Sequence, residues 1–189
     1  MLSRKKYGIY GGSFNPVHKG HILPLVELVN LSDLDAITYI PTYRSPHKKE
    51  LHYIDQNLRV EMVKKAIKPY SFFEISLYEI EKGRSVFTYE TVKYLSKQNR
   101  CNVLIIGYDS YLNFHLWKNY KDILRLVELY VINRPGFEGL NNNIDNSRVS
   151  FYNLKQYNIS STFIRENLSD IEKIKNLIPI EVFEILKSI

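Results

Sequence analysis

Cysteine is nearly absent from this 189-residue sequence, which contains only Cys101. A single cysteine cannot form an internal disulfide or supply a cysteine metal cage, so packing alone must hold the fold together. Long hydrophobic runs are also missing, because even the apolar stretch 126–132 contains Glu128 and falls far short of the roughly 18 residues of a membrane span. The basic residues 4–6 are followed by glycines and polar side chains and not by the apolar segment of a signal peptide. We therefore expect a cytoplasmic protein without a membrane-spanning segment.

Low-complexity stretches and internal repeats are absent too, and the composition is that of an ordinary globular chain, with 44% apolar and 24% charged residues. The length suits one well-buried core. We therefore expect a single domain over residues 1–189, in which the helical portion from about 160 to 189 belongs to the same domain. A formal net charge of +6 favours an anionic partner, such as a nucleic acid, a phospholipid or a phosphorylated small molecule, without choosing among them.

Short apolar runs alternate with segments of helical spacing along the chain. The apolar runs predict strands at residues 7–10, 36–40, 72–75, 103–106, 129–132 and 149–152. The helical spacing predicts helices at residues 18–31, 58–67, 88–95, 161–168 and 180–189, and the Asn-rich segment 136–147 is expected to be a surface loop. Strands and helices that alternate at this spacing indicate an α/β fold with right-handed crossovers. We expect a Rossmann-like, doubly wound, mostly parallel sheet with helices on both faces.

The loop after the first predicted strand has an unusual polar sequence, GGSFNPVHKGH at positions 11–21. Ligands of open α/β sheets bind beyond the carboxyl ends of the strands. Gly11 and Gly12 allow the backbone to approach a ligand closely, and the start of the following helix attracts a phosphate. His18 and His21 lie three residues apart, so both imidazoles face the same side of the first helical turn. The loop therefore indicates phosphate-transfer chemistry.

Other interpretations of this loop stay open on its residues alone. The glycine pair is also typical of a plain turn, and two histidines at helical spacing are often surface or core residues. A zinc pair is a further interpretation, but no Asp, Glu or Cys stands at ligand spacing, so we expect no metal bound by the protein itself. Gly20, between the two histidines, indicates close packing of the helix.

Five segments in the same order along the chain resemble the motifs of the HxGH nucleotidyltransferases, and within them those of the nicotinate mononucleotide adenylyltransferases. The segments are the loop 11–21, SPHK at 45–48, residues 106–117 with their glycine, aspartate and tryptophan, RPG at 134–136, and ISSTFIR at 159–165. Two positions depart from the family pattern, since Asn15 replaces a more common aspartate and Ser45 replaces a proline. Neither change removes a phosphate ligand.

The resemblance implies that the protein transfers the adenylyl group of ATP to nicotinate mononucleotide, which releases pyrophosphate and forms deamido-NAD in NAD biosynthesis. It implies that His18, His21 and Arg165 are catalytic residues, which hold the triphosphate and stabilise the transition state. Mg²⁺ is expected on the ATP phosphates, because it keeps most of its waters and needs few protein carboxylates. The implied partners are ATP and nicotinate mononucleotide, with no nucleic acid and no membrane, and homo-oligomerisation stays open.

The family motifs also imply a set of ATP-binding residues. Within this set, Ser161 and Thr162 are expected to cap the helix that contains Arg165 and to present amides and hydroxyls to the phosphates, and a plain N-cap without a ligand is the alternative role of residues 160–162. Asp109 is expected either to accept a hydrogen bond from the ribose or to cap the helix that follows it. The expected ATP-binding residues are Tyr10, Gly11, Gly12, Ser13, Phe14, His18, His21, Gly107, Asp109, Ser160, Ser161, Thr162 and Arg165.

The acceptor side is expected to involve Lys48, Thr88, Tyr89, Trp117 and Arg134. Trp117, the only tryptophan, offers a flat face for the pyridine ring, with core packing as its alternative role. Lys48 and Arg134 could bind the phosphate or the carboxylate of the acceptor, with a solvated surface as the alternative. Arg59, on a helix face with two lysines, is interpreted as surface charge without a role in binding. These residues do not decide between nicotinate and nicotinamide mononucleotide.

Three other functions compete with this one. Another HxGH adenylyl- or cytidylyltransferase, for example a phosphopantetheine adenylyltransferase, is the nearest alternative, and the 45–48 loop and Trp117 argue against it. A basic nucleic-acid-binding module is the second, but the chain lacks an aromatic RNP-type strand, zinc spacing and a concentrated basic stripe. A catalytically inactive regulator is the third, and the presence of His18, His21 and Arg165 argues against it.

Overall fold

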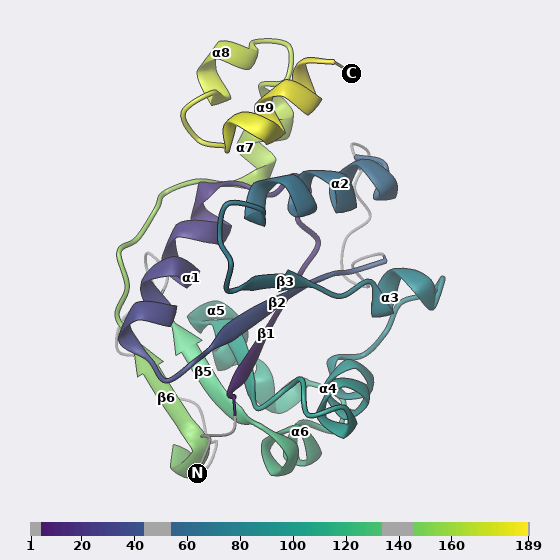
Figure 1. Cartoon of the computed structure of the whole chain (residues 1–189), viewed down its shortest axis with the longest axis vertical. Coiled ribbons are helices and arrows are strands. Elements are labelled where there is room, and N and C mark those ends of the chain that lie inside the picture. Colours follow the sequence, from purple (N-terminus) through teal and green to yellow (C-terminus); the bar gives the residue numbers. More distant parts are fainter. Residues whose placement is uncertain (1–4, 44–53, 134–145, 189) are drawn as a thin grey trace.

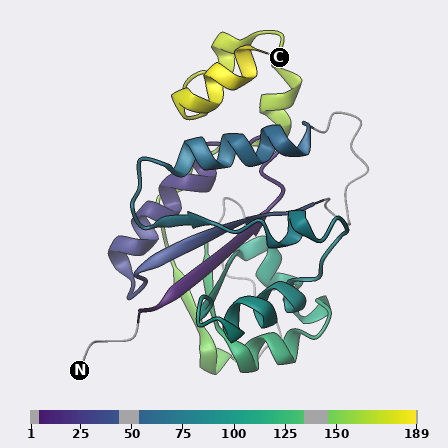
Figure 2. The same cartoon turned by 45° about the vertical axis from the view of Figure 1, so that its right-hand side comes forward.

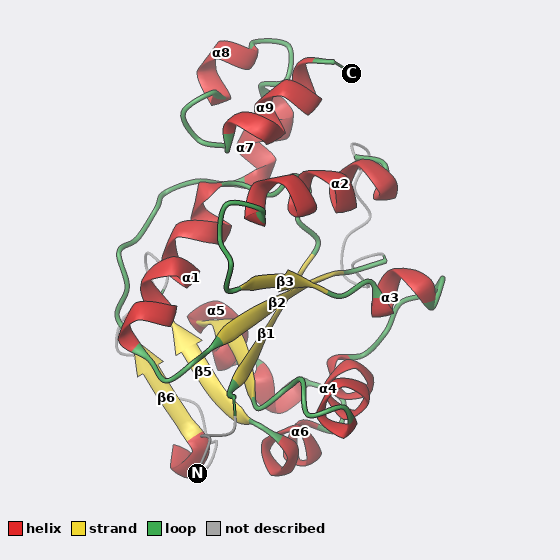
Figure 3. Cartoon of the chain, in the orientation of Figure 1, coloured by secondary structure: helices red, strands yellow, loops and turns green. Residues whose placement is uncertain are grey.

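The computed structural model describes residues 5–43, 54–133 and 146–188. Its centre is a six-stranded sheet in which all neighbouring strands are parallel, in the order β3-β2-β1-β4-β5-β6 (Figures 1 and 3). Every predicted strand is confirmed, with ends shifted by a residue or two at most. The strands are β1 Tyr7–Gly12, β2 Ala36–Pro41, β3 Phe73–Ile75, β4 Val103–Gly107, β5 Glu128–Ile132 and β6 Val149–Tyr152.

The longer helices follow the predicted positions, whereas several short ones were not predicted. α3, α6 and α8 have seven residues or fewer, which is too short to repeat an apolar pattern. The helices are α1 Lys19–Leu31, α2 Gln56–Ile67, α3 Tyr78–Glu81, α4 Thr88–Lys97, α5 Tyr108–Leu112, α6 Tyr120–Leu126, α7 Ser161–Glu166, α8 Ile171–Ile174 and α9 Ile180–Lys187, with the 3₁₀ turns η1 Phe114–Leu116 and η2 Asn146–Arg148. Most of the expected surface loop 136–147 lies outside the described residues. Within the described ranges, no helix combines the length and the hydropathy needed to span a bilayer.

Helices cover both faces of the sheet (Figures 1 and 2), and a hydrophobic core contains side chains from each side. One core contains side chains of α1 and α2, among them the buried Leu25 and Met62. The other contains side chains of α4 and α6, among them Val92 and Ile123. Because both faces are covered, β2 is buried along its whole length, as is typical of a strand in a parallel sheet. The expected α/β class, with helices on both faces, is confirmed.

The C-terminal helices pack over α2, as both cartoon views show (Figures 1 and 2). α9 buries Val182, Phe183 and Leu186 in the same core that contains Met62 and Val63 of α2. The backbone N–H of Lys19, at the start of α1, donates to the carbonyl of Leu177 at 3.0 Å, so the segment between α8 and α9 lies against the end of the loop that follows β1. The chain therefore returns to its first loop after all six strands have been formed.

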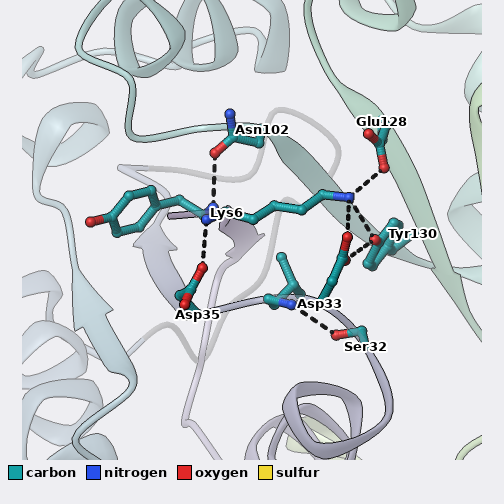
Figure 4. A network of polar contacts seen from close by, with 9 residues as sticks. Lys6, Ser32, Asp33, Asp35, Asn102, Glu128 and Tyr130 are labelled. Carbon is teal, nitrogen blue, oxygen red and sulfur yellow. Dashed lines mark hydrogen bonds and ion pairs between the residues drawn. The ribbon is translucent and has the colours of Figure 1, made fainter. Parts of the chain in front are cut away.

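A network of polar contacts lies at the opposite, amino-terminal edge of the sheet (Figure 4). The Nζ atom of Lys6 is 2.9 Å from a carboxylate oxygen of Asp33 and 2.7 Å from one of Glu128, and it donates to the Tyr130 hydroxyl at 3.0 Å. Tyr130 in turn donates to Asp33 at 2.6 Å. Burial disfavours the Lys6 charge, but the hydrogen bonds outweigh it and raise the pKa of this lysine. The network joins the start of β1, the α1–β2 turn and β5.

A buried carboxyl group links α3 to α4. Glu79 is 6% exposed, and the hydroxyl of Thr91 donates to its Oε1 atom at 2.7 Å. Burial raises the pKa of Glu79 to about 7, because the loss of water around the carboxylate outweighs the Thr91 hydrogen bond, and the negative charge of Glu90 adds to this rise. The group therefore titrates near neutral pH.

Replacing Glu79 with glutamine should change how stability depends on pH. A raised pKa means that the folded state favours the protonated carboxyl. Its contribution to stability is therefore fully present below the ordinary pKa of 4.5 and is lost as the pH rises through about 7. Between about pH 5 and about pH 8, the free energy of unfolding should fall by up to roughly 3 kcal/mol more in the wild type than in Glu79→Gln.

Urea unfolding at the two pH values measures this difference. Glu81→Gln is the control, because Glu81 is exposed in the same helix and its replacement should leave the wild-type pH dependence in place. A Glu79→Gln protein that loses as much stability as the wild type over this range would contradict the prediction.

Candidate active site

The loop between β1 and α1 folds tightly around Phe14. Phe14 has a positive φ of 43° and is 1% exposed, with its ring in the core between Tyr10 and Tyr39. Gly12 allows this arrangement because it has no side chain. A Cβ atom at this position would lie only 3.0 Å from the Phe14 ring and would crowd it. Tyr10 is also buried, at 5% exposed. These two expected ATP-binding residues therefore have their side chains in the core, and only their backbone is available to a ligand.

The two histidines lie together at the start of α1. His18 precedes the helix with an extended backbone, and its ring stacks on that of His21 with 3.7 Å between centroids. The backbone N–H of His18 donates to Nδ1 of His21 at 3.3 Å. When Nδ1 of a neutral imidazole accepts, the hydrogen sits on Nε2, so His21 can present an N–H donor on its far side. The shared face expected from the spacing is confirmed.

Close packing around these rings depends on Gly20. A Cβ atom at this position would lie 3.1 Å from Nδ1 and Cε1 of His18 and 3.6 Å from Cβ of Ile159. The His21 ring is held from the other side by the edge of Phe14, and Tyr39 donates to the His21 carbonyl at 3.0 Å. Gly20 thus has the packing role that the sequence indicates.

Helix α7 contacts the same loop from the far end of the sequence. The hydroxyl of Ser161 donates to the carbonyl of Pro16 at 3.0 Å, and Nη1 of Arg165 donates to the carbonyl of Asn15 at 2.7 Å. Nη2 of Arg165 donates to the Thr162 hydroxyl at 3.3 Å. The fold therefore brings the expected catalytic residue Arg165 to the loop that carries both histidines.

The prediction that Ser161 and Thr162 cap α7 is wrong. Ser161 and Thr162 were expected to cap this helix, but Ser160 does so, since its hydroxyl accepts from the N–H of Phe163 at 3.3 Å. Ser160 has an extended backbone and the helix begins one residue later, so the hydroxyls of the next two residues are placed on other partners.

Asn15, the residue that departs from the family pattern, is buried in this loop at 1% exposed. Its Oδ1 atom accepts from the N–H of Ile54 at 2.9 Å, and its own carbonyl accepts from Arg165. An aspartate oxygen would accept the same bond, so the change from aspartate keeps this contact.

Arg59 is a residue of this site that sequence reasoning missed. It was interpreted as surface charge, but it is 0% exposed, and its guanidinium enters the loop from α2. Nη1 donates to the carbonyl of Ser13 at 2.5 Å, and Nη2 donates to the carbonyls of Thr42 at 3.0 Å and Tyr43 at 3.2 Å. Helical spacing could have revealed it, because Arg59 stands three residues before Met62 on the buried face of α2.

Gly107 and Asp109 lie beside the loop, because β4 is paired with β1. Tyr10 pairs with Ile105, so two residues further along each strand Gly12 is level with Gly107. Gly107 is the N-cap of α5, and Asp109 is the second residue of that helix. The alternative role of Asp109 as the cap is therefore wrong, and the half-buried carboxylate lies at the carboxyl edge of the sheet.

The acceptor residues are only partly described. Thr88 is the first residue of α4, and Trp117 is half-buried, with its ring 5.1 Å from that of Phe114. Tyr89 lines a surface groove of about 430 Å³ between α4 and α6, where Nζ of Lys93 lies 5.4 Å from its ring. Lys48 and Arg134 fall outside the described residues, as do the SPHK and RPG segments.

The chain matches a known family model and curated relatives over most of its length. The cytidylyltransferase-like family model matches residues 9–167. A "Probable nicotinate-nucleotide adenylyltransferase" of Clostridium perfringens is 40% identical, and the match covers 96% of this chain and 95% of the relative. A protein of the same name from Clostridium tetani is 36% identical over 97% of this chain and 96% of its own.

A solved structure has the same fold. The nicotinic acid mononucleotide adenylyltransferase of Plasmodium falciparum, complexed with NaAD, superposes with a TM-score of 0.76 at 22% identity, over 97% of this chain and 96% of that one. The family model covers the sheet, the histidine loop and α7, and the curated relatives extend over nearly all of the chain. The chain therefore belongs to the cytidylyltransferase-like family and groups within it with the nicotinate-nucleotide adenylyltransferases.

Proposed function

We propose that this protein transfers the adenylyl group of ATP to nicotinate mononucleotide, releasing pyrophosphate and forming deamido-NAD. The observation that carries the proposal is the contact between the histidine loop and α7, which places His18 and His21 beside the segment of Arg165. The names of the relatives support the choice of substrates, since they are nicotinate-nucleotide adenylyltransferases at up to 40% identity.

In this reaction a phosphate oxygen of the mononucleotide attacks the α-phosphorus of ATP, and the bond to the pyrophosphate oxygen breaks. No covalent enzyme intermediate is needed. Phosphoryl-type transfer requires mainly positioning and donors placed where negative charge develops. We assign this role to the imidazole N–H groups of His18 and His21 and to the guanidinium of Arg165, which contacts the same loop.

The remaining ATP contacts are assigned to the backbone and to small side chains around these donors. The backbone of Gly11 and Gly12 can approach the nucleotide closely, and Ser13 continues the same loop. Asp109, from the neighbouring β4 edge, is assigned to the ribose. Thr162 presents its hydroxyl beside Arg165 on α7. We assign the backbone of Ser160, Ser161 and Gly107 to the same pocket.

Mg²⁺ is proposed to arrive with the nucleotide. The described residues contain no cluster of three or more His, Cys, Asp or Glu side chains that could form a protein cage. A magnesium ion that keeps several waters and binds the phosphates needs no such cage. The ion would neutralise part of the phosphate charge when it is bound.

The acceptor is assigned to the side of the site formed by Thr88 and Trp117, with Lys48 and Arg134 as the expected cations. Trp117 packs its ring against Phe114, which holds an aromatic face next to the start of α6. Selection of nicotinate over nicotinamide mononucleotide is part of this proposal.

Pyrophosphate release by the purified protein tests the function. Release from ATP should depend on nicotinate mononucleotide and should be much slower with nicotinamide mononucleotide. Release that requires phosphopantetheine in place of the mononucleotide would sink the proposal and favour a different HxGH transferase.

Replacing either histidine should abolish most of the turnover. His18→Ala and His21→Ala each remove a donor from the developing charge, so kcat should fall by at least about 100-fold. Steady-state kinetics measures the loss, and circular dichroism checks that the variants are folded. His115→Ala is the control, because His115 is exposed on η1 and should retain normal turnover. Near-normal kcat in His18→Ala or His21→Ala would contradict their role.

Replacing Trp117 should separate the two substrates. Trp117→Ala should raise the KM for the mononucleotide by roughly 2- to 10-fold, because one aromatic stack of about 0.5–1.5 kcal/mol on the pyridine ring is lost, and it should change the KM for ATP little. Tyr120→Phe, a nearby conservative change, serves as the control. Equal increases of both KM values would show that Trp117 acts only in core packing.

A further inference from the structure

Arg59 holds two loops of the site through their main-chain carbonyls. Its Nη1 contacts the carbonyl of Ser13 in the β1–α1 loop, and its Nη2 contacts the carbonyls of Thr42 and Tyr43 just after β2. The two strands are also joined where they end, because the N–H of Thr42 donates to the carbonyl of Gly12 at 3.0 Å. The guanidinium therefore fixes the orientation of peptide groups in both loops.

The orientation of one carbonyl sets the orientation of the next N–H. In a trans peptide the C=O and the following N–H lie in one plane and point in opposite directions. The peptide between Ser13 and Phe14 is trans, since the cis bond of this loop is the one between Asn15 and Pro16. Because Arg59 draws the Ser13 carbonyl toward α2, the Phe14 N–H points to the opposite side of the loop.

The backbone N–H of Phe14 has no hydrogen-bond acceptor within the described ranges. Phe14 is 1% exposed, and no acceptor within the described ranges receives its backbone N–H. A buried amide of this kind is normally paired, so a donor held without a partner at a loop end is suited to an acceptor that comes from outside the chain. A phosphoryl oxygen is such an acceptor, and His21 lies next to the same residue, with 5.3 Å between ring centroids.

We propose that Arg59 is a positioning residue that aims the Phe14 amide at a phosphoryl oxygen of ATP. The inference rests on the function proposed above. Burying a guanidinium costs free energy, because the group loses its water. An apolar side chain of similar length could therefore fill the same volume, often without loss of stability. Only the guanidinium fixes both loop carbonyls at once, so its effect is expected on turnover more than on folding.

Arg59→Met tests this role by kinetics. The variant loses the bonds to both loops, so kcat should fall by roughly 10- to 100-fold, the loss expected when a backbone donor is no longer aimed at developing charge. Met62→Ala is the matched control, since Met62 is fully buried on the same face of α2. It should lower the melting temperature and leave kcat near the wild-type value. Equal loss of kcat in the two variants would overturn the inference.

Arg59→Lys keeps the test usable if Arg59→Met does not fold. A lysine can reach one carbonyl but not both, so kcat should lie below the wild type while the melting temperature changes little. Normal kcat in Arg59→Lys would also overturn the inference.

Nuclear magnetic resonance separates this inference from the proposed function. With a non-hydrolysable ATP analogue, the Phe14 amide proton of the wild-type chain should shift downfield, and the shift should be lost in Arg59→Lys and kept in Met62→Ala. An unshifted Phe14 amide in an analogue-saturated wild type would overturn the inference. A shift in a protein that shows no turnover with nicotinate mononucleotide would support the positioning role and reject the proposed function.

Discussion

Two arginines hold the β1–α1 loop through its carbonyl oxygens, and the proposed chemistry depends on these contacts. Arg59 reaches the carbonyl of Ser13 from α2, and Arg165 reaches the carbonyl of Asn15 from α7. A neutral carbonyl accepts a hydrogen bond but does not cancel the charge of a guanidinium, which stays protonated in proteins. The same contacts that set the shape of the loop therefore also place positive charge around it, where a triphosphate is proposed to bind.

Cationic side chains contact both ends of the parallel sheet. At the amino-terminal edge, Lys6 is surrounded by the carboxylates of Asp33 and Glu128, so its charge is balanced within the fold. At the carboxyl edge, the contacts of Arg59 and Arg165 given above are to neutral oxygens. The carboxyl edge is where open α/β sheets bind ligands, so the site proposed for ATP lies at the expected end of the sheet.

Strands and long helices could be predicted from the sequence because their apolar segments end at glycine, at proline or where the spacing of apolar residues changes. The short helices α3, α6 and α8 could not, since fewer than two turns give no repeating pattern, whereas the six-residue α7 was predicted as part of the longer segment 161–168. In the site, the shared face of His18 and His21 follows from their spacing alone. Arg59 was missed because its charge was taken to mean exposure, although its spacing from Met62 placed it on the buried face of α2. The roles of Lys48 and Arg134 stay predictions.

The site also depends on segments that cannot form alone. α7 has six residues, too few for a stable isolated helix, and its contacts with the loop run through Ser161 and Arg165. The loop, in turn, takes its shape from contacts with α2, β2 and α7, in which side chains such as Tyr39 bind main-chain carbonyls. The loop and α7 therefore stabilise each other. Ile164 of α7 is fully buried in the core that also contains Met62. Local opening of α7 would therefore disturb this core and break the loop contacts together, so the site and the core are coupled through this helix.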